Sequence, residues 1–113
     1  MNNGHKNDNG KPRTDLLPAA ALLEVACVLD HGAQKYGDDN WKQLNDLERR
    51  YIGAALRHIF ADMNGEREDV DSGLSHMGHA ACSLLFVIQH RLENPEPQYN
   101  PDDVAFTGKG VTR

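Results

Sequence analysis

The residues best suited to chemistry are histidines on segments whose pattern is otherwise helical. His76 and His79 are three residues apart in SGLSHMGHAACSLLF, and His58 lies four residues before Asp62. Residues three or four apart share one face of a helix, so the members of each pair can act together. Transition metals accept imidazole and carboxylate ligands in one site. One interpretation is a mixed metal site of His58, Asp62, His76 and His79 that also draws on the loop carrying Asp69 and Asp71. The alternative is that His76 and His79 are hydrogen-bonded interior residues.

Three helices must position these groups. Apolar residues recur at helical spacing over about residues 17–34, 46–64 and 72–92, and no segment alternates as a strand would. We therefore expect an all-α fold, a small bundle of three main helices with extended termini that is completed by oligomerisation. The expected N-terminal caps are Thr14 or Asp15 for the first helix, Asn45 with Glu48 for the second, and Asp69, Asp71 or Ser72 for the third.

The chain length suits one domain. An Asn- and Gly-rich start predicts a flexible segment over residues 1–10, followed by the helical domain over 11–93. Three of the five prolines lie in residues 94–113, which predicts an extended C-terminal tail.

Each expected helix carries an apolar stripe on one side and a mixed stripe on the other. The mixed stripes combine ionisable groups with small residues such as Ala55, Ala80 and Ser83, which leave space beside the histidines. The third helix has little that requires water and should lie centrally or in a subunit interface. Helix bundles commonly build sites from inward-facing side chains. The predicted pocket is lined by Glu24, His31, Lys35, His58, Asp62, His76 and His79.

The overall composition excludes several classes of partner. With 17 acidic against 12 basic residues, the net charge is −5, which argues against binding long DNA or RNA. No apolar run approaches a membrane span, and the N-terminus lacks the apolar core of a signal peptide. Cys27 and Cys82 lie in apolar helical patterns and are expected to be buried free thiols. These features predict a cytoplasmic protein.

A small anionic ligand remains compatible with the charge. Lys11 and Arg13 precede the first helix, while Lys35 and Arg57 lie along or beside the pocket stripes. Basic groups near carboxylates suggest a phosphorylated ligand, with or without metal. The alternative for Arg57 is a solvated or salt-bridged side chain.

The loop after the first helix could recognise a base. In HGAQKYGDDNW, Tyr36, Asn40 and Trp41 combine aromatic faces with an amide that can read a base edge. The competing interpretation is that Trp41 closes the end of the bundle, because buried aromatic residues dominate small cores.

Several ordered motifs resemble one known family. GKPRTDLLP, HGAQKYGDDNW, LRHIFADMNGE, DVDSG and HMGHAACSLLF, spread over about residues 10–92, are similar to the dATP/dGTP diphosphohydrolase family, which is grouped with the MazG-type all-α nucleotide pyrophosphohydrolases. The resemblance implies a homo-oligomer that cleaves dATP or dGTP to the monophosphate and pyrophosphate with Mg²⁺ or Mn²⁺. On that reading Glu24 and Asp62 are catalytic, and His58, Asp71, His76 and His79 bind metal. Lys11, Arg13, Lys35 and Arg57 then hold phosphate, Tyr36, Asn40 and Trp41 contact the base, and His31 completes the pocket.

The chain departs from the MazG pattern in its acidic motifs. No Glu-x-x-Glu lies on the expected helices, and the Glu-x-x-Asp from Glu68 to Asp71 falls in a loop. An alternative function is therefore a non-catalytic, phage-type binder that sequesters a nucleotide-derived immune signal of the host, such as a cyclic dinucleotide or an ADP-ribose derivative. A plain scaffolding helix bundle is a third alternative.

Overall fold

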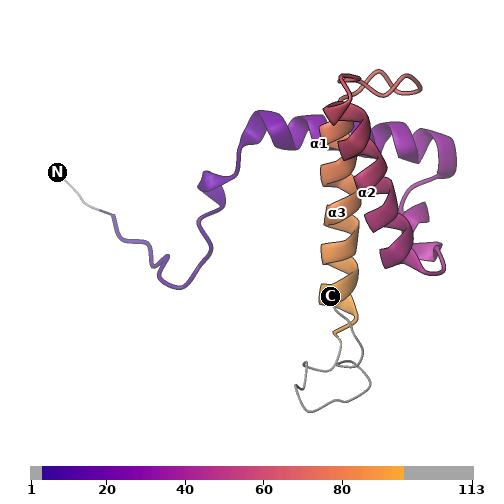
Figure 1. The fold of residues 1–113 in the computed structure, drawn as a ribbon. Coiled ribbons are helices and arrows are strands. Elements are labelled where there is room, and N and C mark those ends of the chain that lie inside the picture. Colours follow the sequence, from indigo (N-terminus) through magenta and orange to yellow (C-terminus); the bar gives the residue numbers. More distant parts are fainter. Residues whose placement is uncertain (1–3, 96–113) are drawn as a thin grey trace, which may run out of the picture.

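The computed structural model describes residues 4–95 and folds them into three α-helices (Figure 1). These are α1 (Ala19–Tyr36), α2 (Leu47–Met63) and α3 (His76–Glu93), with short 3₁₀ turns η1 (Thr14–Leu16) and η2 (Asn40–Gln43). Among the described residues the only β pairing is an isolated bridge between Glu68 and Ser75. The predicted all-α bundle of three main helices is confirmed.

Helices α2 and α3 form an antiparallel pair that is tied at both ends. At one end His58 and His76 bring their Nδ1 atoms to 2.8 Å, and at the other Glu48 Oε2 lies 3.1 Å from His90 Nδ1. Helix α1 crosses this pair near the start of α3 (Figure 1). Helix α3 packs against both other helices, so its predicted central position is confirmed.

Helix α3 begins later than the sequence pattern predicted. Its N-cap is Ser75, whose Oγ accepts a hydrogen bond of 2.8 Å from the Gly78 amide. The predicted caps Asp69, Asp71 and Ser72 are wrong because these residues belong to the preceding loop. There, Asp69 Oδ2 accepts from the Ser72 amide at 2.9 Å. The later start places His76 and His79 in the first turn of α3, next to that loop.

The predicted caps of the other helices are also wrong. Helix α2 follows Asp46, a left-handed residue (φ 58°) that makes no side-chain cap bond. Glu48, expected to complete a capping box with Asn45, instead reaches His90 and Arg91 on α3. Helix α1 follows Pro18, and Thr14 and Asp15 lie in η1 instead.

The mixed stripes, rather than the apolar ones, lie between the helices. Ala55, Ala80 and Ser83 are buried, and their small size lets α2 and α3 pack closely. The apolar core is small, consisting of Val25, Val28, Leu47, Ala55, Ala80, Cys82 and Val87. The apolar stripes stay at the surface, and Phe60 remains 57% exposed. We call this surface the apolar face; it comprises Ile52, Leu56, Phe60 and Met63 of α2 with Leu84, Leu85, Ile88 and Leu92 of α3.

Residues 4–10 are exposed, and the predicted C-terminal tail lies outside the described residues from position 96 onward. Within residues 4–95, every helix falls short of the length and apolar character that a bilayer crossing needs.

Candidate functional site

A cavity of about 690 Å³ lies between the three helices and the η2 segment. Its lining divides into two groups. Ionisable side chains occupy one part: His31, Lys35, His58, Asp69, Asp71 and His79. Aromatic side chains occupy the other: Tyr36, Trp41, Tyr51 and Phe86.

Three histidines form a compact group at the junction of α2 and α3. The rings of His58 and His79 stack with centroids 4.6 Å apart and an interplanar angle of 12°. His76 is buried behind them, and its Nε2 lies 3.1 Å from Glu66 Oε2. His79 Nε2 is hydrogen-bonded to Ser72 Oγ at 2.7 Å. His58 of α2 therefore contacts α3, whereas His76 and His79 of α3 each contact both α2 and the α2–α3 loop.

Burial controls the charge of these imidazoles. It lowers the pKa of His58, and the neighbouring histidines His79 and His76 lower it further. Burial likewise is the main cause that lowers the pKa of His79. Both rings are thus favoured in the neutral form, which can accept hydrogen bonds or bind a metal ion.

The pKa of the loop residue Asp69 is also lowered, but for a carboxyl group this favours the charged form. Burial alone would raise its pKa, but hydrogen bonds from Ser72 and the charges of His79 and His58 together hold it below its usual value. The group is therefore an anion beside neutral imidazoles at neutral pH.

Lys35 on α1 meets the same loop. Its Nζ lies 3.0 Å from Asp71 Oδ2, and His31 Nε2 lies 3.3 Å from the same oxygen. The Lys35 hydrogen bond, followed by that of His31, lowers the pKa of Asp71, and the same contact raises the pKa of Lys35. This exposed cluster connects α1 to the loop before α3.

The aromatic group lies two helical turns from the histidines. Trp41 stacks on Phe86 at 4.3 Å and 12°, and Tyr51 meets Phe86 edge-on at 4.9 Å. On α3, Phe86 follows His79 by seven residues, and on antiparallel α2, Tyr51 precedes His58 by seven. Along both α2 and α3, the helical rise from the histidine to the aromatic residue is therefore about 10 Å.

The structure brings most of the predicted pocket residues together. His31, Lys35, Tyr36, Asn40, Trp41, His58, Asp71 and His79 all line the cavity. His76 does not line it but contacts His58 from behind. The predicted grouping of histidines with Lys35 and the aromatic loop is therefore observed, while their individual roles stay predictions.

Other predicted site residues lie elsewhere. Glu24 accepts a hydrogen bond of 3.1 Å from the Ser75 amide, and Asp62 pairs with Arg67 at 2.9 Å. Arg13 pairs with Asp15 at 2.7 Å, and Lys11 is exposed on the segment before η1. Arg57 lines a separate groove beside the cavity, together with Arg49 and Arg50.

Some residues of the cavity were not among the predicted site residues. Asp69 faces the histidines more closely than the predicted Asp71, and Tyr51 and Phe86 supply aromatic surface. The acidic residues in the short loop between two histidine-bearing helices were a usable signal for Asp69. The seven-residue spacing of Tyr51 from His58, and of Phe86 from His79, was the corresponding signal for the aromatic rings.

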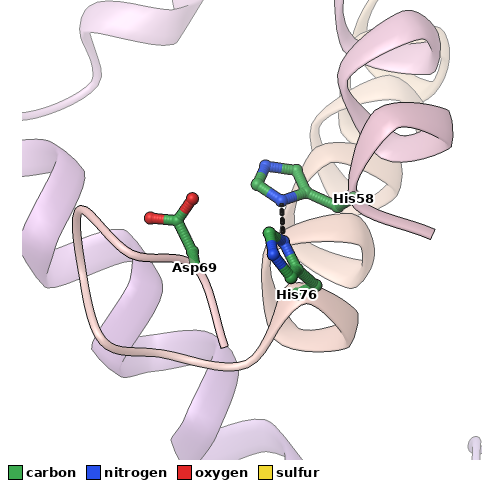
Figure 2. Close-up of side chains that lie close together, drawn as sticks. All are labelled: His58, Asp69 and His76. Atoms are coloured by element: carbon green, nitrogen blue, oxygen red, sulfur yellow. Dashed lines mark hydrogen bonds between the residues drawn. The ribbon is translucent and has the colours of Figure 1, made fainter. Parts of the chain in front are cut away.

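The donor atoms near Asp69 restrict the cation that could bind there. One ligand atom each from His58, Asp69 and His76 lie within 4.8 Å of one another (Figure 2). Two of the three are imidazole nitrogens, whereas Mg²⁺ prefers oxygen ligands. This donor set does not fit Mg²⁺, one of the two cations that the family resemblance implied, and suits first-row transition ions better.

Cys82 lines the same cavity and is buried, as predicted. Cys27 is exposed, so the prediction that both thiols are buried is wrong for this residue. Cys27 was expected inside because its helical pattern is apolar, but α1 packs against α3 with the side that carries Val25 and Val28, and this leaves Cys27 exposed.

Burial raises the pKa of Cys82 to about 11. Only the thiolate reacts, so about one Cys82 in a thousand is reactive at pH 8. We expect a disulfide reagent such as DTNB to label Cys27 quickly and Cys82 many times more slowly in the folded protein. The variant Cys27→Ser isolates the slow phase, and both thiols should react alike in denaturant. Equal rates in the folded protein would contradict the buried position of Cys82.

Comparison with known proteins agrees with the sequence motifs. Residues 1–100 match the family model described as dATP/dGTP diphosphohydrolase, N-terminal. The chain is also 39% identical over 84 residues to a protein named dATP/dGTP diphosphohydrolase from Salmonella phage PMBT28. That alignment covers 74% of this chain but only 28% of the phage protein, so the chain spans little more than a quarter of that relative. Among solved structures, none matches this chain. The family match over most of its length shows that the chain belongs to the dATP/dGTP diphosphohydrolase N-terminal family.

Proposed function

We propose that this chain binds a purine deoxynucleoside triphosphate in the 690 Å³ cavity and takes part in its cleavage to the monophosphate and pyrophosphate. The observation that carries the proposal is the arrangement of the cavity, in which the imidazoles of His58 and His79 lie about 10 Å along the helices from the aromatic rings of Tyr51 and Phe86. That separation is comparable with the reach of a nucleotide from its base to its phosphates. The name of the phage relative points to the same substrates.

The aromatic part suits a purine. Trp41 and Phe86 already stack on each other, and Tyr36 at the rim is 64% exposed. A base would stack on the outer face of Trp41 or on Tyr36, since stacking on aromatic side chains holds bases without regard to sequence. The amide of Asn40, beside Trp41, can hydrogen-bond to the base edge.

The ionisable part suits phosphates only in the presence of cations. Lys35 is the one lysine of this part, whereas Asp69 and Asp71 are both acidic, and Asp38 and Asp39 add two more carboxylates elsewhere in the lining. With neutral histidines, this part would repel a triphosphate. We therefore propose that cleavage depends on a divalent cation, with Lys35 leaving Asp71 to contact the phosphates directly.

Cleavage is tested by product analysis. Water adds to the α-phosphorus, the bond from that phosphorus to the bridging oxygen breaks, and pyrophosphate leaves with the electron pair. We expect dGTP or dATP with Mn²⁺ to yield equal amounts of monophosphate and pyrophosphate. Nucleotide recovered unchanged after tight binding would overturn cleavage and leave the sequestering function; no binding at all would overturn both.

Binding itself can be followed through Trp41, the only tryptophan in the chain. We expect dGTP to quench its fluorescence. Lys35→Gln should weaken triphosphate binding about tenfold, because a charge-assisted hydrogen bond contributes about 1.5 kcal/mol or more. It should leave the affinity for deoxyguanosine unchanged. Lys6→Gln is the matched control, since Lys6 is an exposed lysine of the N-terminal segment outside the cavity lining. Equal effects of the two substitutions would place the phosphates away from Lys35.

A further inference from the structure

The side chains of His58, Asp69 and His76 converge from three segments of the chain. His58 comes from the last turns of α2, Asp69 from the loop, and His76 from the first turn of α3. Figure 2 shows the two imidazoles facing each other, with Asp69 of the loop beside them.

The two imidazoles face each other through the same type of atom. His58 Nδ1 and His76 Nδ1 are 2.8 Å apart. At this distance one nitrogen carries a proton and donates it to the lone pair of the other. Two nitrogens bound to one tetrahedral zinc ion lie about 3.3 Å apart, given metal–nitrogen distances of about 2.1 Å. An ion could thus replace this proton if the rings separated by about half an ångström.

Glu66 determines which ring nitrogen of His76 carries the free lone pair. Glu66 Oε2 lies 3.1 Å from His76 Nε2, and a carboxylate there holds the proton on Nε2. The lone pair of His76 is then on Nδ1, the atom that faces His58. Carboxylates that hold the remote nitrogen of a ligating histidine are a regular feature of metal sites.

The loop holds Asp69 in place. Its Oδ2 accepts from the Ser72 amide at 2.9 Å, its own amide donates to the Leu74 carbonyl at 2.8 Å, and its carbonyl accepts from the Gly73 amide at 2.7 Å. The bridge between Glu68 and Ser75 closes this turn. The carboxylate is therefore positioned before any ligand arrives, which reduces the entropy lost on binding.

We propose that His58, Asp69 and His76 form a binding site for one first-row transition metal ion. The ion would have two imidazole nitrogens and one carboxylate oxygen from the protein. His58 and Asp69 also line the cavity, so the remaining coordination positions face it and can take water or an oxygen of an anionic ligand. The site belongs to the chain alone and goes beyond the proposed function, because it needs no nucleotide.

The donor set predicts an order of affinity. Sites with nitrogen ligands bind divalent ions more tightly from Mn²⁺ to Co²⁺ to Ni²⁺, with Zn²⁺ also tight, and bind Mg²⁺ poorly. We expect one Zn²⁺ or Co²⁺ per chain by equilibrium dialysis and elemental analysis, weaker binding of Mn²⁺, and no displacement by millimolar Mg²⁺. Bound Co²⁺ should also give a visible absorption band that reports nitrogen ligands.

Two variants and one control test the assignment. His58→Gln and Asp69→Asn should each lower Co²⁺ affinity by tenfold or more and shift its absorption band. Both residues are only partly buried, so the helical fold can be checked by circular dichroism. His90→Gln is the control, because His90 also lies on α3 next to a carboxylate, that of Glu48.

The outcome does not depend on the proposed function, because the metal ion alone is the probe. Stoichiometric binding that is lost in both variants and kept in His90→Gln supports the site. Absence of binding above the background of the denatured chain would overturn it. Equal losses in the control, or tighter binding of Mg²⁺ than of Zn²⁺, would overturn it as well.

Discussion

Replacing Ile88 with glutamate is expected to convert an oligomer of this protein into monomers. Ile88 lies on the apolar face and is 53% exposed, and Met63 and Leu92 on the same face are 73% and 72% exposed. Contiguous apolar surface of this kind marks interfaces rather than surfaces that stay in water. The partner that we infer is a second copy of the chain.

Helix geometry makes the apolar face continuous. On α2 its residues Ile52, Leu56 and Phe60 are spaced by four, as are Leu84, Ile88 and Leu92 on α3. At about 100° per residue, each stripe is rotated by about a third of a turn from the line along which the two helices touch. Because the helices are antiparallel, the same rotation directs both stripes to one side of the pair. That side is opposite to α1, so a second copy could cover it and leave the cavity open.

A carboxylate in this interface would be desolvated without a partner. In a twofold dimer the substitution occurs twice, and we expect a loss of about 3 kcal/mol or more, which is over a hundredfold in the dimer dissociation constant. Light scattering after size exclusion would show the change in mass. Gln43→Glu, an exposed position on η2 away from the apolar face, should keep the wild-type mass. A wild-type protein that is monomeric at tens of micromolar would refute the interface.

Gly78→Val should destabilise the fold by about 3 kcal/mol, in the range measured for overpacked interiors. Gly78 is buried where the first turn of α3 meets α1. A Cβ at this position would lie 2.8 Å from Ser75 Oγ, 3.1 Å from Glu24 Cγ and 3.5 Å from Val28 Cγ2. Valine would therefore displace the N-cap of α3 and push α1 away.

Gly53→Val makes the same change in a different setting. Gly53 is in α2, and its Cβ would meet only Arg57 Nη1 at 3.5 Å, an ordinary contact. Valine is a slightly better helix former than glycine, so the free energy of unfolding should stay within about 0.5 kcal/mol of wild type. Urea unfolding at equal protein concentrations would compare the two variants. If Gly78→Val proved as stable as Gly53→Val, α1 would not pack on the first turn of α3 as described.

The helices could be predicted from the sequence because their apolar periodicity is local. Which stripe of each helix packs inside could not be predicted, because this depends on how closely the helices approach one another. Leucine and phenylalanine are the usual core residues, yet Ala55 and Ala80 are buried while Phe60 is half-exposed. Small residues allow α2 and α3 to pack closely, and the larger apolar residues are then left for another surface.

The same contrast between local periodicity and tertiary structure applies to the site residues. Stripe analysis grouped His31, Lys35, His58 and His79 correctly, since each helix fixes its own side chains relative to the others. Of the two carboxylates in the loop, Asp71 rather than Asp69 was predicted as the metal ligand, because a loop has no periodicity that orients its side chains. In the structure the turn of this loop includes Gly73 at φ 72°, Asp69 lies beside His58, and Asp71 pairs with Lys35.

The backbone amides that begin α3 are already engaged by the protein. Ser75 N–H donates to Glu24 Oε2, His76 N–H to the Arg67 carbonyl, and Gly78 N–H to Ser75 Oγ. The positive end of a helix dipole is a common place for phosphate, but here the carboxylate of Glu24 occupies it. The dipole of α3 therefore fastens α1 instead of a ligand. An anion that enters the cavity would therefore have to be held by side chains such as Lys35 rather than by this helix end.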